Sequence, residues 1–325
     1  MKKALIAATL GAASLFGSMT QAQSLPQKFD EPVTVVVPYA PGGASDRAAR
    51  IVGDALQARF GATVIVENRT GAGGRIAAQY VKNADPAKNT LLIGNPAIMV
   101  VAPMVYQDLA YDAVKDFAPV AMATQYGFGI AVSGDSSIKS LDDLVAWAKA
   151  NPNEFNVAVP ATGSLPHFFG LMLADKIGVR AEVIGYRGSA PAITDLIGGM
   201  VPVAIDTLDA LTEQHNAGRI RIIATSGKER ETSLPKVPTF SEQGVELVSA
   251  GWNTLFAPAG TPADKVALLG DMVKAVVSDP KVQETLLGGN LIPMPANTAE
   301  TVKAIQEFRA QWEPVVKASN YVVTK

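Results

Sequence analysis

The chain contains no cysteine, which excludes disulfides, thiolate nucleophiles, iron–sulfur clusters and cysteine-ligated zinc. Only two histidines, His167 and His215, remain for imidazole chemistry. The formal net charge is −2 and basic residues form no cluster, so the phosphate-binding surface of a nucleic-acid-binding protein is excluded. Acidic residues at metal-ligand spacing are also missing. We therefore expect a protein that uses no metal and no other cofactor.

Apart from one stretch near its start, the chain has no apolar run that approaches the length of a membrane span. Lys2 and Lys3 precede an apolar stretch at residues 4–16, and residues 20–22 offer small side chains for cleavage. This stretch is shorter than the roughly 20 residues that a permanent spanning helix needs. A membrane anchor or a buried first helix is the alternative, but the segment that follows is polar. The sequence predicts a signal peptide over residues 1–22, cleaved after about Ala22, and export to the periplasm.

Short apolar runs alternate with longer amphipathic stretches through the rest of the chain, which is typical of α/β layers. The first series has strands at 33–37, 64–66 and 91–93 and helices at 45–60 and from 76. The second series has strands at 130–132, 156–159, 183–184, 201–205 and 220–225 and helices at 141–150, 166–176 and 190–197. A strand at 254–256 then precedes helices at 262–277, 280–287 and 299–318. Ser140 and Asp143 are expected to form a capping box on the helix at 141–150.

These two series predict two similar α/β domains. The last part of the chain is too rich in helices to stand alone, so we expect the chain to cross between the domains twice. Domain 1 is predicted at 24–125 plus 248–325, and domain 2 at 126–247. Two crossovers side by side would form a hinge, with a ligand cleft between the domains.

The loop at 37–46 joins a predicted buried strand to a helix and contains Gly42 and Gly43. Two glycines let the backbone turn sharply and expose N–H groups at the helix N-terminus, where the helix dipole favours an anion. The alternative is a simple turn in which Ser45 or Asp46 caps the helix. The sequence by itself favours neither interpretation.

Two further loops lead from a strand into a helix. At 161–167, hydroxyl and amide groups are suited to holding an anion, and His167 either adds a donor or supports the loop. The segment at 186–191 has the same position after the next strand. Asp206 ends the strand at 201–205, where it either orients a ligand or caps a helix at 207–211.

Three other features of the sequence do not indicate a binding or catalytic site. The segment at 71–77 has Ile76 in place of the third glycine of a dinucleotide fingerprint, so Arg75 is interpreted as a solvated charge. No G-x-S-x-G motif of a serine hydrolase occurs. His215 lies next to a helix end at 216–218, where it would serve the helix dipole or solvent.

Six segments resemble, in order along the chain, the tripartite tricarboxylate transporter family of periplasmic solute-binding receptors, often called Bug receptors. They are VVVPYAPGGASD (35–46), NRTGAGG (68–74), KDFAPV (115–120), YRGSAP (186–191), LPKVPTF (234–240) and GWNTLFAPAGTP (251–262). The resemblance implies an α/β, two-lobed periplasmic binding protein fold with a double crossover and a central cleft. It also implies a monomeric receptor that closes on a small carboxylate and delivers it to the permease subunits of a membrane transporter.

The resemblance further implies a set of ligand-binding residues in the loops described above. They are Tyr39, Ala40, Gly42, Gly43, Asp46, Asn95, Thr162, Gly163, Ser164, His167, Tyr186, Gly188, Ser189 and Asp206. Three places depart from the family pattern, and one of them, Lys88-Asn89 in place of aspartate–glycine before the third strand, lies outside the expected pocket. Ala161 stands where such receptors have glycine, and Gly185 replaces the proline that precedes the tyrosine.

Two alternatives to a transport receptor remain. A sensor accessory protein that presents its ligand to a membrane signalling partner would use the same pocket. A hydrolase or lyase without a cofactor would use His167 with Asp206, but the chain has neither a nucleophile motif nor metal-ligand spacing. The sequence does not distinguish dicarboxylates, tricarboxylates, aromatic acids, amino acids and neutral amides as ligands.

We expect the mature protein to begin at Gln23 and to be found in the periplasmic fraction, because Lys2, Lys3 and the apolar stretch form an export signal. The intact mass of protein released by osmotic shock would test this. Replacing both lysines by glutamate should retain the uncleaved form in the cell. Recovery of the Met1 form in membranes would contradict the prediction.

Overall fold

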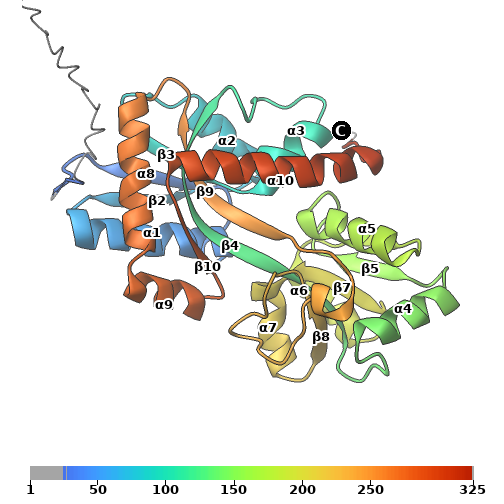
Figure 1. The fold of residues 1–325 in the computed structure, drawn as a ribbon. Helices are drawn as coiled ribbons and strands as arrows, with labels where there is room; N and C mark the ends of the chain where they lie inside the picture. Colours follow the sequence, from blue (N-terminus) through green and yellow to red (C-terminus); the bar gives the residue numbers. More distant parts are fainter. Residues whose placement is uncertain (1–24, 27, 324–325) are drawn as a thin grey trace, which may run out of the picture.

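Two lobes of α/β structure are joined by one long strand, β4 (Phe117–Ser133), in the computed structural model (Figure 1). The first part of β4 pairs antiparallel with β9 (Ala250–Pro258). Its last part pairs antiparallel with β7 (Val203–Thr207) and β8 (Ile220–Thr225). The structure describes residues 25–26 and 28–323, so the predicted signal peptide lies outside the described residues.

The first lobe is built on three parallel strands, β1 (Val33–Val37), β2 (Val64–Asn68) and β3 (Asn89–Gly94), to which β9 adds antiparallel. A short strand, β10 (Ile292–Ala296), pairs with β4. The helices of this lobe are α1 (Ala44–Phe60), α2 (Arg75–Lys82), α3 (Ala102–Val105), α8 (Ala263–Val277), α9 (Pro280–Gly288) and α10 (Thr298–Ala318), with a short 3₁₀ helix η1 (Ala72–Gly74) and a π-helix η2 (Ala97–Val101).

The second lobe repeats the pattern on a smaller scale. Strand β5 (Asn156–Val159) lies between β6 (Glu182–Gly185) and β7, all parallel. The helices of this lobe are α4 (Leu141–Ala150), α5 (Leu165–Ile177), α6 (Ser189–Ile197) and α7 (Leu208–Asn216), with a short turn η3 (Ser241–Gln243) before the chain returns to β9. The sheet order is β2-β1-β3-β9-β4-β7-β5-β6, as expected for two sheets that share one strand.

The change of partner along β4 is abrupt. Gly127 lies opposite Ala250 of β9, and the next residue, Phe128, lies opposite Thr207 of β7. The crossing between lobes therefore occurs within one residue on this strand, and β9 returns beside it. The predicted domain boundaries at 125/126 and 247/248 lie close to this point, but the boundaries themselves stay a prediction.

The chain contacts the second lobe again near its C-terminus. After α10, the ring of Tyr321 packs edge-on against His167 at 5.4 Å and Phe168 at 6.2 Å in the second lobe. Two residues later, the N–H of Val323 donates to the carbonyl of Val105 at 2.9 Å in the first lobe. The segment after α10 thus contacts both lobes.

The helices expected at 45–60, 141–150, 262–277, 280–287 and 299–318 are present with ends that agree to within a residue or two. Ser140 caps α4 as predicted, because its side chain accepts from the N–H of Asp143 and Asp143 accepts in return. The expected strand at 130–132 proves to be the end of the much longer β4. Glycine and proline within residues 117–129 weaken the strand pattern there, and pairing with β9 compensates for it.

Strand β10 and the helical stretch at 97–105 were not expected from the sequence. The strand has prolines at 293 and 295, and its register with β4 is irregular between Pro293 and Ala296. Proline cannot donate to a sheet, so such a strand is tolerated only at an irregular or one-sided pairing. His215 lies in the last turn of α7 and is partly exposed, and its Nδ1 also accepts from the N–H of Ile222 in β8 at 3.1 Å, a contact that the sequence did not indicate.

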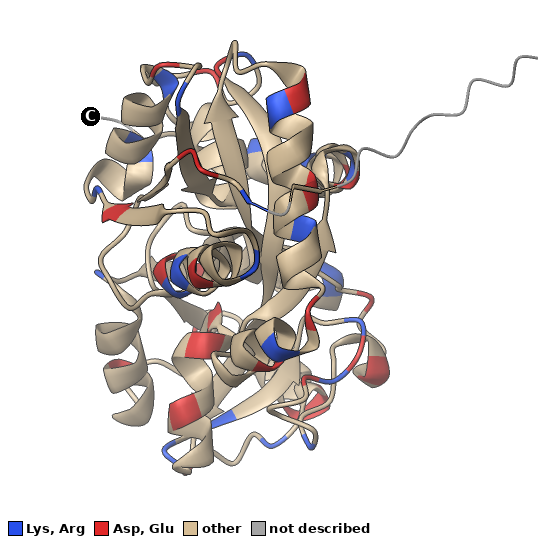
Figure 2. Ribbon diagram, turned by 90° about the vertical axis from the view of Figure 1, so that its left-hand side faces the viewer, with Lys and Arg blue, Asp and Glu red and all other residues tan. Residues whose placement is uncertain are grey.

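A continuous apolar core supports the crossing. The ring of Phe128 lies 5.2 Å from Phe169 of α5 and 6.2 Å from Trp312 of α10, and all three are fully buried. Among the described residues, no helix combines the length and apolar character needed to cross a membrane. Figure 2 shows acidic and basic residues interspersed on the side it presents, as the composition indicates.

Candidate ligand-binding site

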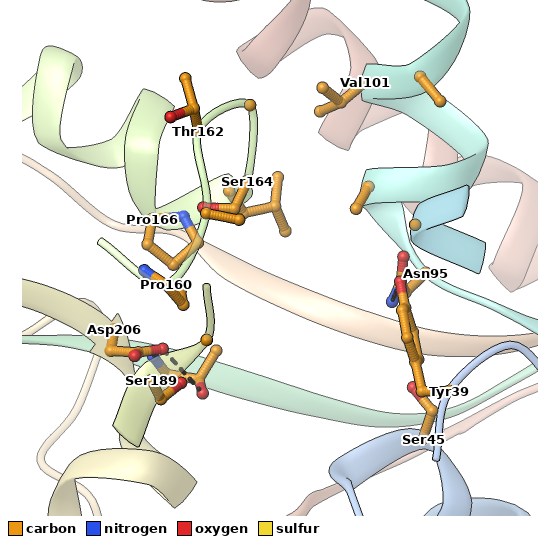
Figure 3. Close-up of a pocket in the computed structure, with 18 of the residues that line it drawn as sticks. Tyr39, Ser45, Asn95, Val101, Pro160, Thr162, Ser164, Pro166, Ser189 and Asp206 are labelled. Carbon is orange, nitrogen blue, oxygen red and sulfur yellow. Dashed lines mark hydrogen bonds between the residues drawn. The ribbon is translucent and has the colours of Figure 1, made fainter. Parts of the chain in front are cut away.

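A cavity of about 620 Å³ lies between the two lobes, a volume suited to a small molecule (Figure 3). The first lobe contributes the loop after β1, the start of α2, the loop after β3 and the stretch η2–α3. The second lobe contributes the loops after β5, β6 and β7. Tyr126 and Phe128 of β4 and the C-terminal Tyr321 and Val323 complete the lining. The cavity therefore collects the carboxyl ends of strands from both sheets, the usual ligand position in such folds.

Three helices begin at this cavity without a side-chain cap. Their N-cap residues are Gly43 for α1, Gly188 for α6 and Thr207 for α7, and none supplies a capping hydrogen bond. The first N–H groups of a helix have no partner within the helix, and the dipole makes this end positive. The three helix ends thus offer backbone donors to a ligand from both lobes.

The N-terminus of α1 is held in place by buried polar contacts. The hydroxyl of Ser45 donates to Oδ1 of Asn253 in β9 at 2.7 Å, and Nδ2 of Asn253 donates to Thr124 of β4 at 3.0 Å. These contacts fix the helix end against the two crossing strands. Ser45 therefore does not cap α1. Capping by Ser45 was part of the alternative interpretation of this loop.

Gly42 and Gly43 have separate roles. Gly42 has a φ of +90°, a backbone conformation that L side chains rarely adopt, and it does not line the cavity. Gly43 has an ordinary extended conformation with φ −74° and lines the cavity. Gly42 makes the turn, whereas the missing side chain of Gly43 leaves room beside the backbone donors.

Asp46 stabilises the turn at Gly42 through hydrogen bonds to its carboxylate. Its Oδ2 accepts from the N–H of Gly42 at 2.9 Å and from Nε of Arg50 at 3.0 Å, and its Oδ1 accepts from Nδ2 of Asn68 at 2.8 Å. Burial raises the pKa of Asp46, but these hydrogen bonds outweigh it and hold that pKa below the usual value. The carboxylate remains charged and fully engaged within the loop.

Tyr39 and Asn95 present a polar group to the cavity from the first lobe. Nδ2 of Asn95 donates to the hydroxyl oxygen of Tyr39 at 2.9 Å, and its Oδ1 accepts from the N–H of Ile98 at 3.2 Å. Because the Tyr39 oxygen already accepts this hydrogen bond, its own proton remains available to a ligand. Burial raises the pKa of Tyr39, so the hydroxyl stays neutral and keeps that proton.

His167 stabilises the loop at 161–164 through a hydrogen bond to its backbone. Its Nδ1 accepts from the N–H of Gly163 at 2.8 Å, and its ring stacks on Phe168. Burial lowers the pKa of His167, so the ring stays neutral with its remaining proton on Nε2. His167 does not line the cavity. Its position is that of a structural hydrogen-bonding residue.

The departure from the family pattern at Gly185 has a steric reason. A Cβ at Gly185 would collide with the hydroxyl and backbone of Thr162, which lines the cavity. Glycine at this position therefore makes room for Thr162. The neighbouring Tyr186 points away from the cavity, because its hydroxyl donates to Asp195 of α6 at 2.8 Å.

Asp206 is a buried carboxyl in the wall of the second lobe. Its Oδ1 accepts from the N–H of Thr207 at 2.7 Å, and its Oδ2 is buried without a hydrogen-bond partner among the described residues. Burial raises the pKa of Asp206 to about 6, because the nearby Ser189 side chain and Thr207 N–H only partly offset the loss of solvent. A lining carboxyl with a free oxygen and a pKa near neutrality can donate or accept a hydrogen bond.

The structure brings most of the expected residues together around one cavity. The expected residues that line it are Tyr39, Gly43, Asn95, Thr162, Gly163, Ser164, Gly188, Ser189 and Asp206. Five others lie just outside the lining: Ala40, Gly42, Asp46, His167 and Tyr186. Gly42, Asp46 and His167 hold the lining loops in shape.

Several lining residues were not expected from the sequence. Arg75, interpreted as a solvated charge, lies in the cavity wall with its guanidinium 3.7 Å from the ring centre of Tyr106. Asp209 lines the second lobe, and its Oδ2 lies 3.6 Å from Nη2 of Arg47 across the cleft. The position of Arg75 at the start of a helix after a glycine-rich loop was the available signal.

The architecture, with two α/β lobes on shared strands and a cavity at the strand ends between them, defines a two-lobed periplasmic binding protein. A family model described as "Tripartite tricarboxylate transporter family receptor" matches residues 48–321. The chain therefore belongs to this family of receptors.

Individual relatives agree with this assignment. A UPF0065 protein of Bordetella bronchiseptica is 36% identical over 305 residues, covering 92% of this chain and 88% of that protein. An R. palustris protein solved with adipate has 32% identity and a TM-score of 0.79, covering 89% of this chain and 97% of that one. MatC from Rhodopseudomonas palustris, solved with malate, has 29% identity and a TM-score of 0.74, covering 88% of this chain and 99% of that one.

The substitution Gly43→Val should lower the affinity for a ligand of this cavity tenfold or more, because the valine side chain would enter the cavity beside the α1 donors. The variant should lose only about 1 kcal/mol of stability, because valine is a poorer N-cap than glycine, while φ is ordinary and the nearest atom to a Cβ is the Ala40 oxygen at 3.8 Å. Calorimetry with adipate, together with urea unfolding, would measure both.

Gly42→Ala is the matched control. It should lose about 1–2 kcal/mol of stability through its positive φ and change adipate affinity much less, because Gly42 lies outside the lining. Unchanged affinity in a folded Gly43→Val variant would show that this loop is only a turn.

Asp206 should make stability fall as pH rises. Because its folded-state pKa is about 6 and its unfolded value is near 4, the folded protein binds the proton more tightly between these values. The contribution is greatest below pH 4 and is lost as pH rises through 6, a change of about 3 kcal/mol. Asp206→Asn removes it, so the variant should gain stability relative to the parent between pH 4 and 7.5. Urea unfolding at several pH values would measure this, and an unfolding free energy that differs between parent and variant by the same amount from pH 4 to 7.5 would contradict the assignment.

Proposed function

We propose that this protein is a periplasmic receptor that closes its two lobes on a small molecule with at least one carboxylate and delivers it to a membrane permease of the tripartite tricarboxylate type. The observation that carries the proposal is the convergence of three uncapped helix N-termini, at Gly43, Gly188 and Thr207, on one cavity between the lobes. Backbone N–H groups at helix ends are suited to an anion without any metal.

Lobe closure follows from where these donors lie. The α1 donors belong to the first lobe, and the α6 and α7 donors belong to the second. A ligand that contacts both sets binds the closed arrangement more tightly than the open one and so shifts the population toward closure. The interlobe pair of Arg47 and Asp209, at 3.6 Å, adds to the closed arrangement.

A carboxylate is favoured over a cation or a sugar by the hydrogen-bond donors around the cavity, and the acidic lining residue Asp209 lies 3.6 Å from Arg47, which offsets its charge. Arg75 is the one basic side chain among the described lining residues, and Tyr39 offers a neutral donor. Asp206 does not oppose an anion strongly, because a pKa of about 6 lets it take up a proton when an anion binds nearby. The adipate and malate bound by two related proteins are both carboxylates.

The proposal includes export and domain organisation. A periplasmic location rests on the predicted signal peptide, and membership of a receptor family supports it. Domain 1 at 24–125 plus 248–325 and domain 2 at 126–247 would move about the β4–β9 crossing as the cleft closes. The protein would act as a monomer, with the permease as its membrane partner.

The enzyme alternative is not supported by the site geometry. His167, which a hydrolase or lyase would pair with Asp206, has its Nδ1 occupied by the N–H of Gly163 and does not line the cavity. Membership of a receptor family also points away from catalysis. A sensor accessory role would use the same cavity and differs only in the membrane partner.

A thermal-shift screen tests the ligand class most directly. Carboxylates should raise the melting temperature, whereas neutral amides of the same shape should not, for example adipate against adipamide. A ligand at 100 times its Kd stabilises by about 2.7 kcal/mol, which is a readily measured shift. Native mass spectrometry of freshly purified protein would then weigh any ligand retained from the cell. Stabilisation by neutral sugars or cations alone would contradict the proposal.

A further inference from the structure

The segment that follows α10 forms a wall of the ligand cavity that no motif in the loops indicates. Tyr321 and Val323 both line the cavity, although they lie far along the chain from the other lining residues. Figure 1 shows the C-terminal end of α10 lying near α3 of the first lobe, on the side that faces α5. The wall is therefore built by residues that belong to neither set of strand-end loops.

A specific turn fixes the position of Tyr321. Asn320 has a φ of +50°, and asparagine is one of the few residues other than glycine that adopts this conformation readily. The hydroxyl of Ser319 donates to the carbonyl of Val316 at 2.6 Å and accepts from the N–H of Tyr321 at 3.2 Å. The helix therefore ends in a built turn that directs the chain back toward the cleft.

The ring of Tyr321 packs closely on the second lobe. It meets His167 edge-on at 5.4 Å, and a Cβ at Gly163 would lie 2.8 Å from its Cε1. Glycine at position 163 is thus required both by its φ of +79° and by the approach of this ring. The loop that offers Thr162 and Ser164 to the cavity is in direct contact with Tyr321.

The other end of the segment is held by the first lobe. Val323 pairs with Tyr106, and its N–H donates to the carbonyl of Val105 at 2.9 Å. Tyr106 also carries the guanidinium of Arg75 on its ring at 3.7 Å. The segment thus spans the cavity from the second-lobe loop at 162–164 to the first-lobe stretch at 101–106.

We propose that Tyr321 is a specificity-determining residue whose ring limits the length of ligand that the closed cavity accepts. This inference rests on the proposed function of the same cavity. The hydroxyl of Tyr321 forms no hydrogen bond with another described residue, so the side chain contributes bulk to the wall and leaves its polar end for ligand or water. A shorter side chain would extend the cavity between His167 and Tyr106.

Calorimetry with straight-chain dicarboxylates from succinate to suberate tests the proposal. In the parent, affinity should fall beyond a limiting length. Tyr321→Ala should favour the longest members over the shortest by about tenfold relative to the parent, since burying two further methylenes is worth roughly that factor. Tyr321→Phe keeps the ring and should keep the order of affinities. If the alanine variant does not fold, Tyr321→Leu, whose side chain is intermediate in size, takes its place in the test.

Tyr80→Ala is the control, because it removes a tyrosine ring that lies outside this cavity and contacts Arg69 at 3.6 Å. It should leave the order of affinities unchanged. A Tyr321→Ala variant that weakens every dicarboxylate by the same factor, or that keeps the parental order, would overturn the inference while leaving the receptor function intact. If no carboxylate binds the parent at all, the proposed function itself fails.

Discussion

Strand β4 is hydrogen-bonded to both lobes, and the geometry of the cleft depends on this sharing. Its first part pairs with β9 and its last part with β7 and β8, with the change of partner between Gly127 and Phe128. Because one strand belongs to both sheets, the carboxyl ends of the parallel strands in the two lobes meet across a single gap. The buried ring of Phe128, packed between Phe169 and Trp312, holds this crossing in the core. A ligand cavity forms at the crossing as a consequence of topology.

The chemical character of the cavity comes mainly from backbone groups. Three helices begin there without side-chain caps, so their first N–H groups remain for a ligand. Charged side chains near these ends are mostly occupied elsewhere: Asp46 holds the turn at Gly42, and Arg47 binds the carbonyls of Gly42 and Gly289. In the proposed function, these backbone donors would recognise a carboxylate by geometry and leave the choice of the rest of the ligand to the surrounding side chains. Receptors of one family can therefore share these loops and still differ in ligand.

Three parts of the cavity wall lie outside the residues that the sequence indicated. Arg75 on Tyr106, Asp209 beside Arg47, and the segment carrying Tyr321 surround the same space as the loop residues. Two of these features join the lobes, since Arg47 meets Asp209 across the cleft and Tyr321 contacts the second lobe from the end of α10. In the proposed function, selection of a ligand and closure of the cleft would therefore involve the same residues.

The sequence alone determined the α/β class, the glycine turn at 42–43 and the capping box at Ser140, and its resemblance to the receptor family indicated nine residues that line the cavity. These are local features, or motifs carried by short segments, because backbone conformation and capping depend on neighbouring residues. The tertiary structure decided the rest. Arg75 has the pattern of a solvated charge until α3 brings Tyr106 beneath it, and the pKa of Asp206 rises only when packing removes its solvent. Such properties depend on contacts between residues distant in the chain, which a linear pattern does not contain.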